Sequence, residues 1–272
     1  MKKIGLFVVI WLGVVSYSYA QRIVSLSGTL TEILAGLGLE KNIVGVDVTS
    51  TFPITVDKLP KVGHVRQVGS EAILSLRPTE VVVLQESGIR PELVRQLEQA
   101  GVKVTQFKQT LSPAGTEELI KQMALHYKKG VQGQKMIQTM RAQMRKTVAA
   151  KNRPKVLFIY ARGAGSLQVS GKNTSVDQLI HLAGGSNAVQ GFDDFKPLTT
   201  ESLVAANPDY ILLFSSGLQS IGGMEGLLKI PGMKLTTAGK KQQIIEIDGL
   251  LLTGFGPRLG LAVQTLHKRL YP

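Results

Sequence analysis

The sequence predicts an α/β protein made of two halves with a long helical stretch between them. In each half, short runs rich in Val, Ile and Leu alternate with segments whose apolar residues recur at helical spacing. This rhythm is typical of a mainly parallel sheet covered by helices. Between the halves, residues 114–150 keep a helical pattern, with breaks near Gly130 and Gly133. A length of 272 residues suffices for two modest domains.

The expected elements follow one another in a regular order. In the first half the strands are 23–26, 43–46, 80–84 and 102–104, and the helices are 30–37, 70–76 and 92–100. In the second half the strands are 155–160, 210–214 and 243–247, and the helices are 175–182 and 257–270. The last helix begins with a proline, which is favoured at a helix start because its missing N–H would have no partner there.

The first twenty residues have the pattern of a signal peptide. Lys2 and Lys3 precede an apolar run, and Ser18-Tyr19-Ala20 forms a small-x-small cleavage site. The run is shorter than the roughly 20 apolar residues that span a bilayer. We therefore expect residues 1–20 to be removed near Ala20 and a soluble periplasmic protein to remain, with an uncleaved N-terminal anchor as the alternative. The chain has no cysteine, which excludes disulfides, thiolate metal sites and a lipoprotein anchor.

The composition indicates a folded globular protein whose charge suits an anionic partner. Hydrophobic residues make up 43% of the chain and charged residues 19%, as in ordinary globular proteins. The formal net charge of +13 suits an anionic ligand or surface. Nucleic acid is not expected as a partner, because the basic residues are scattered and no nucleic-acid motif is present.

No enzyme signature is present. The sequence contains no Walker loop, no metalloprotease motif and no G-x-S-x-G. Asp193 and Asp194 are adjacent carboxylates in a loop, which indicates a turn rather than a catalytic pair. We therefore expect that the protein is not an enzyme, and a secreted α/β hydrolase or chelatase-like protein remains as an alternative of another class.

Of the four histidines, one lies at a junction between elements. His126, His181 and His267 fall inside helical patterns, whereas His64 lies in the loop Gly63-His64-Val65-Arg66. Loops of this kind often carry ligand-contacting residues, and an imidazole there can bind a metal. On spacing alone, an ordinary loop histidine remains the commoner interpretation.

Six segments, spread over nearly the whole chain after residue 21, resemble a known family. They are RIVSLSGTLTEILAGL (22–37), IVGVDVTSTFP (43–53), LPKVGHVRQVGSEAILSLRPTEVVV (59–83), LQVSGKNTSVDQLIHLAGGSNAV (167–189), ESLVAANPDYILL (201–213) and GFGPRLGLAVQTLH (254–267). In this order they resemble periplasmic binding proteins of the cobalamin, siderophore and haem uptake class, and its haem-binding branch in particular.

The resemblance implies a fold and a set of domain boundaries. It implies two Rossmann-like lobes joined by a single long helix, with the ligand cleft between the lobes. On this basis we expect an N-terminal lobe at 21–125, the connecting helix at 126–153 and a C-terminal lobe at 154–272.

The resemblance also implies haem as the transported ligand and a first set of contacts. Relatives often place an iron-ligating Tyr in the loop equivalent to GHVRQ, and this chain has His64 there. Arg66 is then expected beside the porphyrin, where it pairs with a propionate or hydrogen-bonds the axial ligand. Thr51 and Phe52 are weaker candidates for the rim of the cleft.

The second lobe is expected to supply the remaining contacts. Tyr160 and Arg162 occupy the loop after the VLFIY strand, and Tyr160 is a candidate second iron ligand. Arg258 resembles a basic residue near the cleft, with a solvated residue at a helix start as the equally weighted alternative. Such a set suits haem, which is a flat apolar disc with two carboxylates and an iron atom open to a ligand.

Proteins of this class deliver their cargo to an ABC permease of the inner membrane. The resemblance implies one docking Glu per lobe, and Glu92 and Glu225 are the candidates, although either can be an ordinary solvated acid. We expect a monomeric carrier, with an outer-membrane haem receptor upstream. Cobalamin or a ferric siderophore is the alternative cargo. The haem hypothesis alone requires His64, because a siderophore already fills the coordination sphere of its iron.

Overall fold

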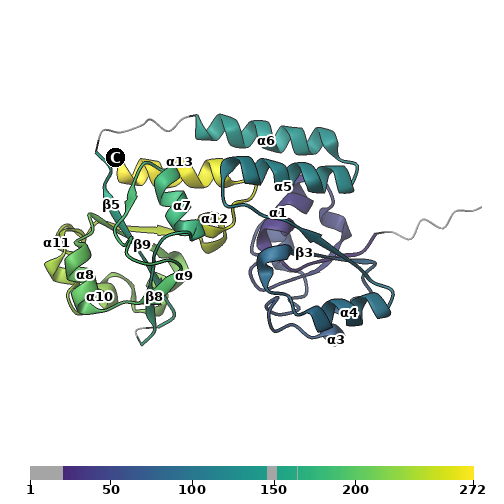
Figure 1. Ribbon diagram of the computed structural model, residues 1–272, viewed down its shortest axis with the longest axis horizontal. Helices are drawn as coiled ribbons and strands as arrows, with labels where there is room; N and C mark the ends of the chain where they lie inside the picture. Colours follow the sequence, from purple (N-terminus) through teal and green to yellow (C-terminus); the bar gives the residue numbers. More distant parts are fainter. Residues whose placement is uncertain (1–20, 146–151, 164) are drawn as a thin grey trace, which may run out of the picture.

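The computed structural model describes residues 21–145, 152–163 and 165–272, which form two α/β lobes side by side beneath a layer of helices (Figure 1). The expected signal peptide at residues 1–20 lies outside the described residues. Within the described part of the chain, no helix combines the length and the apolar character needed to cross a membrane.

The first lobe is built on a four-stranded parallel sheet with the strand order β2-β1-β3-β4. Its strands are β1 (Ile23–Ser25), β2 (Ile43–Val46), β3 (Glu80–Leu84) and β4 (Lys103–Phe107). Its helices are α1 (Gly28–Gly36), α2 (Ile54–Asp57), α3 (Ser70–Leu74) and α4 (Pro91–Gln99), with 3₁₀ turns at Glu40–Asn42 and Gln85–Ser87. Each crossover between parallel strands is thus made through helical segments, as parallel pairing requires.

The second lobe is built on a mixed sheet with the order β10-β9-β5-β6-β8, and β7 pairs with β5. Strands β9, β5, β7 and β10 pair in parallel, whereas β6 and β8 extend the sheet in antiparallel fashion. Its strands are β5 (Lys155–Ala161), β6 (Leu167–Ser170), β7 (Ser186–Asn187), β8 (Phe195–Pro197), β9 (Tyr210–Phe214) and β10 (Ile244–Ile247). Its helices are α7 (Ser175–Leu182), α8 (Thr200–Ala206), α9 (Ser215–Ser220), α10 (Gly223–Leu228), α11 (Thr237–Lys241), α12 (Gly249–Thr253) and α13 (Leu259–Leu270), with a 3₁₀ turn at Met233–Leu235.

The stretch between the lobes consists of two helices, α5 (Pro113–His126) and α6 (Gly130–Met144). Helix α5 packs on α6, and α6 packs on α13 of the second lobe. Ile137 of α6 is buried in a core of the first lobe, and Met140, three residues later, is buried in a core of the second. One helix therefore belongs to both hydrophobic cores. Residues 146–151 of the expected connecting helix lie outside the described part of the chain.

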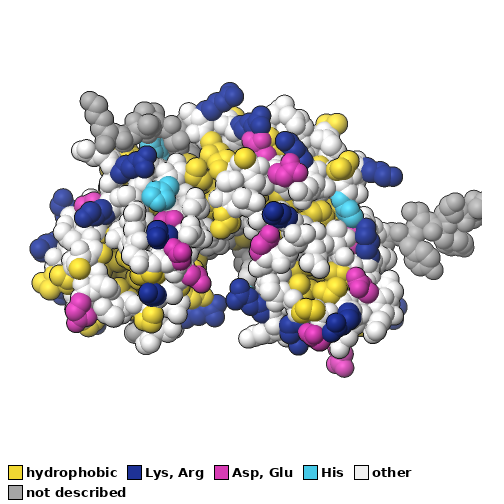
Figure 2. All heavy atoms as spheres, in the orientation of Figure 1, with side chains coloured by type: hydrophobic (Ala, Val, Ile, Leu, Met, Phe, Trp, Pro, Cys, Tyr) yellow, Lys and Arg dark blue, Asp and Glu magenta, His cyan; other side chains and the backbone are white. Residues whose placement is uncertain are grey.

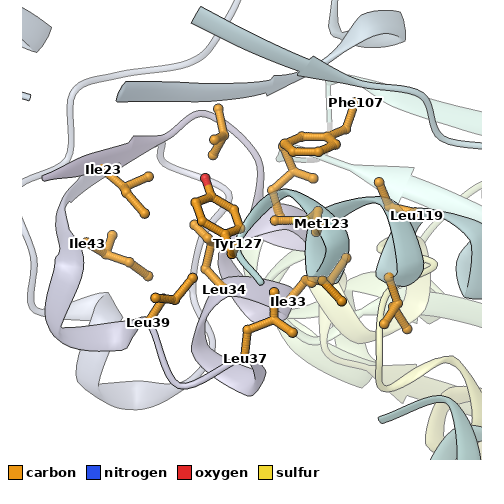
Figure 3. Close-up of a cluster of buried hydrophobic side chains, with 14 of the residues drawn as sticks. Ile23, Ile33, Leu34, Leu37, Leu39, Ile43, Phe107, Leu119, Met123 and Tyr127 are labelled. Atoms are coloured by element: carbon orange, nitrogen blue, oxygen red, sulfur yellow. The ribbon is translucent and has the colours of Figure 1, made fainter. Parts of the chain in front are cut away.

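The core of the first lobe joins the sheet to the helices that cover it. Figure 3 shows Ile23 of β1, Leu34 of α1 and Met123 of α5 meeting in this cluster. All three side chains are fully buried. Burying a large aliphatic side chain contributes about 1.5–3 kcal/mol, so α5 is held to the first lobe by its apolar face.

A buried carboxylate, that of Glu80 in β3, joins this sheet to the end of α5. Glu80 is 3% exposed, and its oxygens accept hydrogen bonds from Thr105 Oγ1 (2.5 Å), Gln21 Nε2 (2.9 Å) and Tyr127 OH (3.2 Å). His126 Nε2 lies 2.8 Å from Glu80 Oε1. Burial alone raises the pKa of Glu80, but the bonds from Thr105 and His126 and the charges of His126 and Lys103 hold it below its ordinary value.

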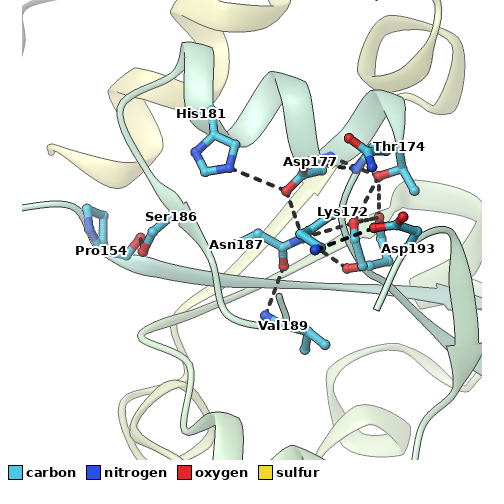
Figure 4. A network of polar contacts seen from close by, with 12 residues as sticks. Pro154, Lys172, Thr174, Asp177, His181, Ser186, Asn187, Val189 and Asp193 are labelled. Carbon is cyan, nitrogen blue, oxygen red and sulfur yellow. Dashed lines mark hydrogen bonds and ion pairs between the residues drawn. The ribbon is translucent and has the colours of Figure 1, made fainter. Parts of the chain in front are cut away.

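A second polar network closes the loops of the second lobe (Figure 4). Asn187 Nδ2 donates to the carbonyls of Ser170 and Gly171 (both 3.1 Å) and to Asp177 Oδ1 (3.0 Å). Asp177 in turn accepts the backbone N–H of Asn173 at 3.2 Å. The network satisfies buried polar groups where α7 begins, so it fixes the position of that helix on the sheet.

We predict that Glu80→Gln lowers the free energy of unfolding at pH 7 by about 2 kcal/mol, since charge-assisted hydrogen bonds are lost. Because the folded pKa of Glu80 lies below its ordinary value of 4.5, its stabilising contribution is present above that pH and is lost as the pH falls. The wild type should therefore lose its advantage over the variant in acid. Urea unfolding at pH 7 and pH 4 measures this, with the exposed Glu98→Gln as control. An equal difference at both pH values would contradict the prediction.

Candidate functional site

A cleft of about 680 Å³ lies between the two lobes. Figure 2 shows the hollow between the lobes, with Lys or Arg side chains on both sides of its mouth. The residues that line the cleft are Ser27, Gly28, Thr29, Thr49, Thr51 and Gln109 from the first lobe, and Tyr160, Ala161, Arg162, Phe214, Ser215, Ser216, Gln219, Asp248, Gly249, Leu250, Thr253 and Gly254 from the second.

Many of these residues lie at or just after the carboxyl end of a parallel strand. Ser27–Thr29 follow β1, Gln109 follows β4 and Arg162 follows β5. Ser215 and Asp248 stand in the same relation to β9 and β10. Open parallel sheets bind ligands outside the carboxyl ends of their strands, and here the two sheets present those ends to the same cleft.

The floor of the cleft is a close contact between the lobes at the start of α1. A Cβ atom at Gly28 would lie 2.6 Å from Leu250 Cδ1 and 2.8 Å from the carbonyl oxygen of Thr49. The first contact comes from the opposite lobe and the second from the backbone of the same lobe. Only glycine therefore allows α1 to begin at this point of the floor.

The segment Gly254–Arg258 of the second lobe is bonded to α1, to α5 and to the loop after β4. Thr29 Oγ1 and Gln109 Nε2 donate to the carbonyl of Gly254 at 2.5 and 2.9 Å. Thr116 Oγ1 donates to the carbonyl of Phe255 at 3.0 Å. Phe255 is buried and adopts a positive φ of 47°, a conformation that costs a non-glycine residue about 1–3 kcal/mol. These bonds hold the segment in that conformation.

Arg258 is not among the residues that line the cleft. Its guanidinium is bonded to Glu32 of α1 through both Nε (3.0 Å) and a terminal nitrogen, and it lies over the ring of Phe52, 3.8 Å from the centroid. Glu32 is 7% exposed. Burial raises the pKa of Glu32, and the hydrogen bond and the charge of Arg258 oppose that rise. The structure thus gives Arg258 a partner within the protein.

Tyr160 and Arg162 stand together on the wall that the second lobe contributes. Tyr160 lies within β5 and not, as the sequence predicts, in the loop after it, whereas Arg162 directly follows the strand. The guanidinium carbon of Arg162 lies 5.3 Å from the centroid of the Tyr160 ring. The ring of Phe214 meets that of Tyr160 edge to face at 5.8 Å. A phenol, a cation and an aromatic surface therefore occupy one wall of the cleft.

His64 and Arg66 lie in a turn of the first lobe, outside the cleft lining. The backbone N–H groups of Gln67 and Val68 donate to the carbonyl of His64 at 2.8 and 2.9 Å. The backbone N–H of Arg66 donates to His64 Nδ1 at 3.3 Å, and Arg66 Nε donates to the carbonyl of Ser87 at the same distance. The turn therefore fixes the orientation of the imidazole and leaves its Nε2 without a bond to the described residues.

The other predicted residues are placed as follows. Thr51 lines the cleft, and Phe52 beside it is exposed and covered on one face by Arg258. Glu92 in the first turn of α4 and Glu225 in the first turn of α10 are both exposed, and they pair with Arg95 and Lys229. Figure 1 places α4 and α10 at the ends of the lobes away from α5, α6 and α13. In the described part of the chain no three His, Asp or Glu side chains are grouped so that they could hold a metal ion.

A family model described as "Periplasmic binding protein" matches residues 23–250. The chain therefore belongs to the periplasmic binding protein family. The predicted fold class, an α/β protein of two lobes, is confirmed. So is the prediction that the protein is not an enzyme, because the members of this family are binding proteins for transport.

Solved structures of haem-binding proteins are similar over almost the full described chain. The periplasmic heme-binding protein RhuT from Roseiflexus sp. RS-1, in apo form, is 39% identical with a TM-score of 0.86, and the match covers 93% of this chain and 98% of that chain. The periplasmic heme-binding protein BhuT, solved in complex with two hemes, is 37% identical with a TM-score of 0.84, over 92% of this chain and 97% of that chain.

Curated relatives are more distant. An uncharacterized ABC transporter substrate-binding lipoprotein, YvrC of Bacillus subtilis, is 27% identical over 93% of this chain and 80% of its own length. The vitamin B12-binding protein of Vibrio campbellii is 27% identical over 75% of this chain and 74% of its own length.

We predict that Gly28→Ala lowers the free energy of unfolding by about 1–3 kcal/mol, because the added methyl group must displace Leu250 or the Thr49 backbone. Urea unfolding measures the loss. Gly130→Ala is the matched control, since Gly130 also begins a helix and a Cβ there meets nothing within 4 Å. Equal stability of wild type and Gly28→Ala would contradict the close contact.

Proposed function

We propose that this chain captures haem in the cleft between its lobes and delivers it to an ABC importer. The observation that carries the proposal is the pairing of Tyr160 with Arg162 on the cleft wall. The haem-binding proteins that resemble this chain at 37–39% identity support the cargo, and the substrate-binding relative of an ABC transporter supports the partner. The match to a family of periplasmic binding proteins supports the periplasm as the place where the protein works.

Tyr160 is the proposed iron ligand on the second lobe. A phenolate binds haem iron in several protein classes. The guanidinium of Arg162, 5.3 Å from the ring, attracts the negative charge that an iron-bound phenolate carries. Phe214 and Leu250, which also line the cleft, offer apolar surface to the porphyrin.

His64 is the proposed ligand on the first lobe. The hydrogen bond that its Nδ1 accepts from the Arg66 backbone limits how it can bind iron. A neutral imidazole that accepts a bond at Nδ1 carries its proton on Nε2. Coordination of iron through Nε2 moves that proton to Nδ1, so the bond from the Arg66 N–H must break. We therefore assign the stronger ligation to Tyr160 and a conditional second ligation to His64.

The propionates need guanidinium partners at the mouth of the cleft. Arg162 is exposed and lines the cleft, and Arg66 is exposed on the facing lobe with one nitrogen bonded to Ser87. Carboxylates prefer the forked donors of arginine. We assign the propionates to these two residues rather than to Arg258, which is bonded to Glu32.

Cobalamin is the second candidate cargo, because curated relatives at 23–28% identity are named for binding it. The cleft lining holds one arginine, which speaks against a ferric siderophore, a ligand for which several arginines are expected. The two remaining cargoes differ in what they require of Tyr160, because only haem iron needs a protein ligand from it.

The test is a visible-absorption titration of the protein with hemin. We expect a saturable Soret shift in the wild type. Tyr160→Phe should weaken binding by at least about tenfold, equivalent to ~1.4 kcal/mol, and should remove the phenolate charge-transfer absorption. His64→Ala should have the smaller effect.

Tyr210→Phe is the matched control, because Tyr210 is a half-buried tyrosine of the same lobe whose hydroxyl bonds to the Leu270 carbonyl away from the cleft. Its titration should equal that of the wild type. Absence of any saturable shift with hemin, together with saturable binding of cyanocobalamin, would replace haem by cobalamin as the cargo.

Docking to the permease is assigned to Glu92 and Glu225. Both carboxylates are exposed, one per lobe, on helices at the ends of the lobes remote from the helix layer (Figure 1). Their partners Arg95 and Lys229 are themselves exposed, so these pairs are weak and can exchange with charges of another protein.

We predict that the double variant Glu92→Ala, Glu225→Ala binds hemin as the wild type does but supports at least about tenfold less haem uptake in cells, a loss typical of removing interfacial charge pairs. Uptake is measured in cells in which the variant replaces the native protein. Glu71→Ala with Glu98→Ala, two other exposed acids of the first lobe, should leave uptake unchanged. Normal uptake by the Glu92, Glu225 variant would refute the docking assignment.

A further inference from the structure

We propose that the Glu32–Arg258 ion pair, with Phe52 stacked on its guanidinium, is a positioning device that fixes the separation of the two lobes and so the width of the ligand cleft. Glu32 and Phe52 belong to the first lobe and Arg258 to the second. The inference concerns the geometry of the cleft, and its effect on haem release rests on the proposed function.

The first support is that Glu32 and Phe52 both contact the guanidinium of Arg258. The guanidinium is bonded to Glu32 through two nitrogens and lies 3.8 Å from the centroid of the Phe52 ring. The side chain of Arg258 is 19% exposed and that of Glu32 is 5% exposed. Removing one partner of an ion pair so far from water strongly destabilises the folded protein, because the other charge is left buried.

The second support is that Arg258 and Phe52 lie next to residues that line the cleft on its two sides. Asp248 Oδ1 lies 4.0 Å from a terminal nitrogen of Arg258, and Asp248 lines the cleft and caps α12 through the Leu251 N–H. Phe52 directly follows Thr51, which lines the opposite side. A movement of Arg258 is therefore transmitted to both walls.

The third support is that the ion pair and the neighbouring hydrogen bonds attach the second lobe to α1 at two different points. Thr29 and Gln109 hold the carbonyl of Gly254 at the floor of the cleft. These bonds, with the bond from Thr116 to the adjacent carbonyl of Phe255, form one point of attachment between the lobes. Arg258, four residues further along, adds a second attachment to α1, and two attachments on one helix restrict the rotation of one lobe on the other.

The absence of cysteine allows a direct test. Gln96→Cys on α4 and Ala205→Cys on α8 place spin labels at exposed positions, one in each lobe. Pulsed electron-spin distance measurements on the haem-free protein report the separation of the lobes. We expect a single narrow distribution in the wild type and a broader or shifted one in Glu32→Gln. Arg258→Lys, which keeps the charge but not the fork, should lie between them.

Glu117→Gln is the matched control, since Glu117 forms a two-point ion pair with Arg141 that joins α5 to α6 without reaching Arg258. Its distances should equal those of the wild type. If Glu32→Gln does not fold, Phe52→Leu at an exposed position decides by the same measurement. Wild-type distances in whichever of these two variants folds would overturn the proposal.

The dissociation of haem supplies the second readout. Glu32→Gln should release haem at least about fivefold faster to apomyoglobin, while its Soret spectrum stays that of the wild type because Tyr160 is untouched. An unchanged rate beside changed distances would restrict the device to the haem-free protein and overturn its role in release. If the wild type binds no haem, the proposed cargo fails, and the distances still decide the role of the ion pair.

Discussion

The bonding of residues 254–258 to α1 and α5 is the constraint on which the cleft depends. The two lobes each fold around their own sheet, and helix α6 is shared by both hydrophobic cores. Here the carbonyls of Gly254 and Phe255 are taken up by first-lobe side chains, and Arg258 reaches the buried Glu32. Because buried polar groups must be paired, this contact has few alternative arrangements. It therefore brings the two rows of strand ends to face each other.

The chemistry of the cleft follows from that juxtaposition. The first lobe contributes mainly hydroxyl and amide groups, and the second contributes Tyr160, Arg162 and Phe214. A flat apolar ligand with carboxylates at one edge can rest on the aromatic wall and keep its charged edge near the mouth, where basic side chains gather (Figure 2). This asymmetry separates the contributions of the lobes, with the aromatic and cationic side chains on the second.

Much of this architecture could be predicted from the sequence. The alternation of apolar runs located β1, β5 and β9, because buried parallel strands have a strong signal. It missed β6, β7 and β8. Strand β8 (Phe195–Pro197) is exposed throughout and shows no alternation. Of the site, Tyr160, Arg162 and Thr51 line the cleft.

Other residues of the site have no signature in the sequence. Gln109 and Asp248 belong to no motif, although their positions just after parallel strands identify them once the sheet order is known. The partner of Arg258 lies 226 residues away and could not be inferred from spacing.

Helix α6 has a consequence for the ancestry of such proteins. Ile137 and Met140 serve different cores less than one turn apart, so neither lobe can be exchanged as an independent module. A chimera of two relatives must match both cores along the same helix, and the lobes are therefore bound to diverge together.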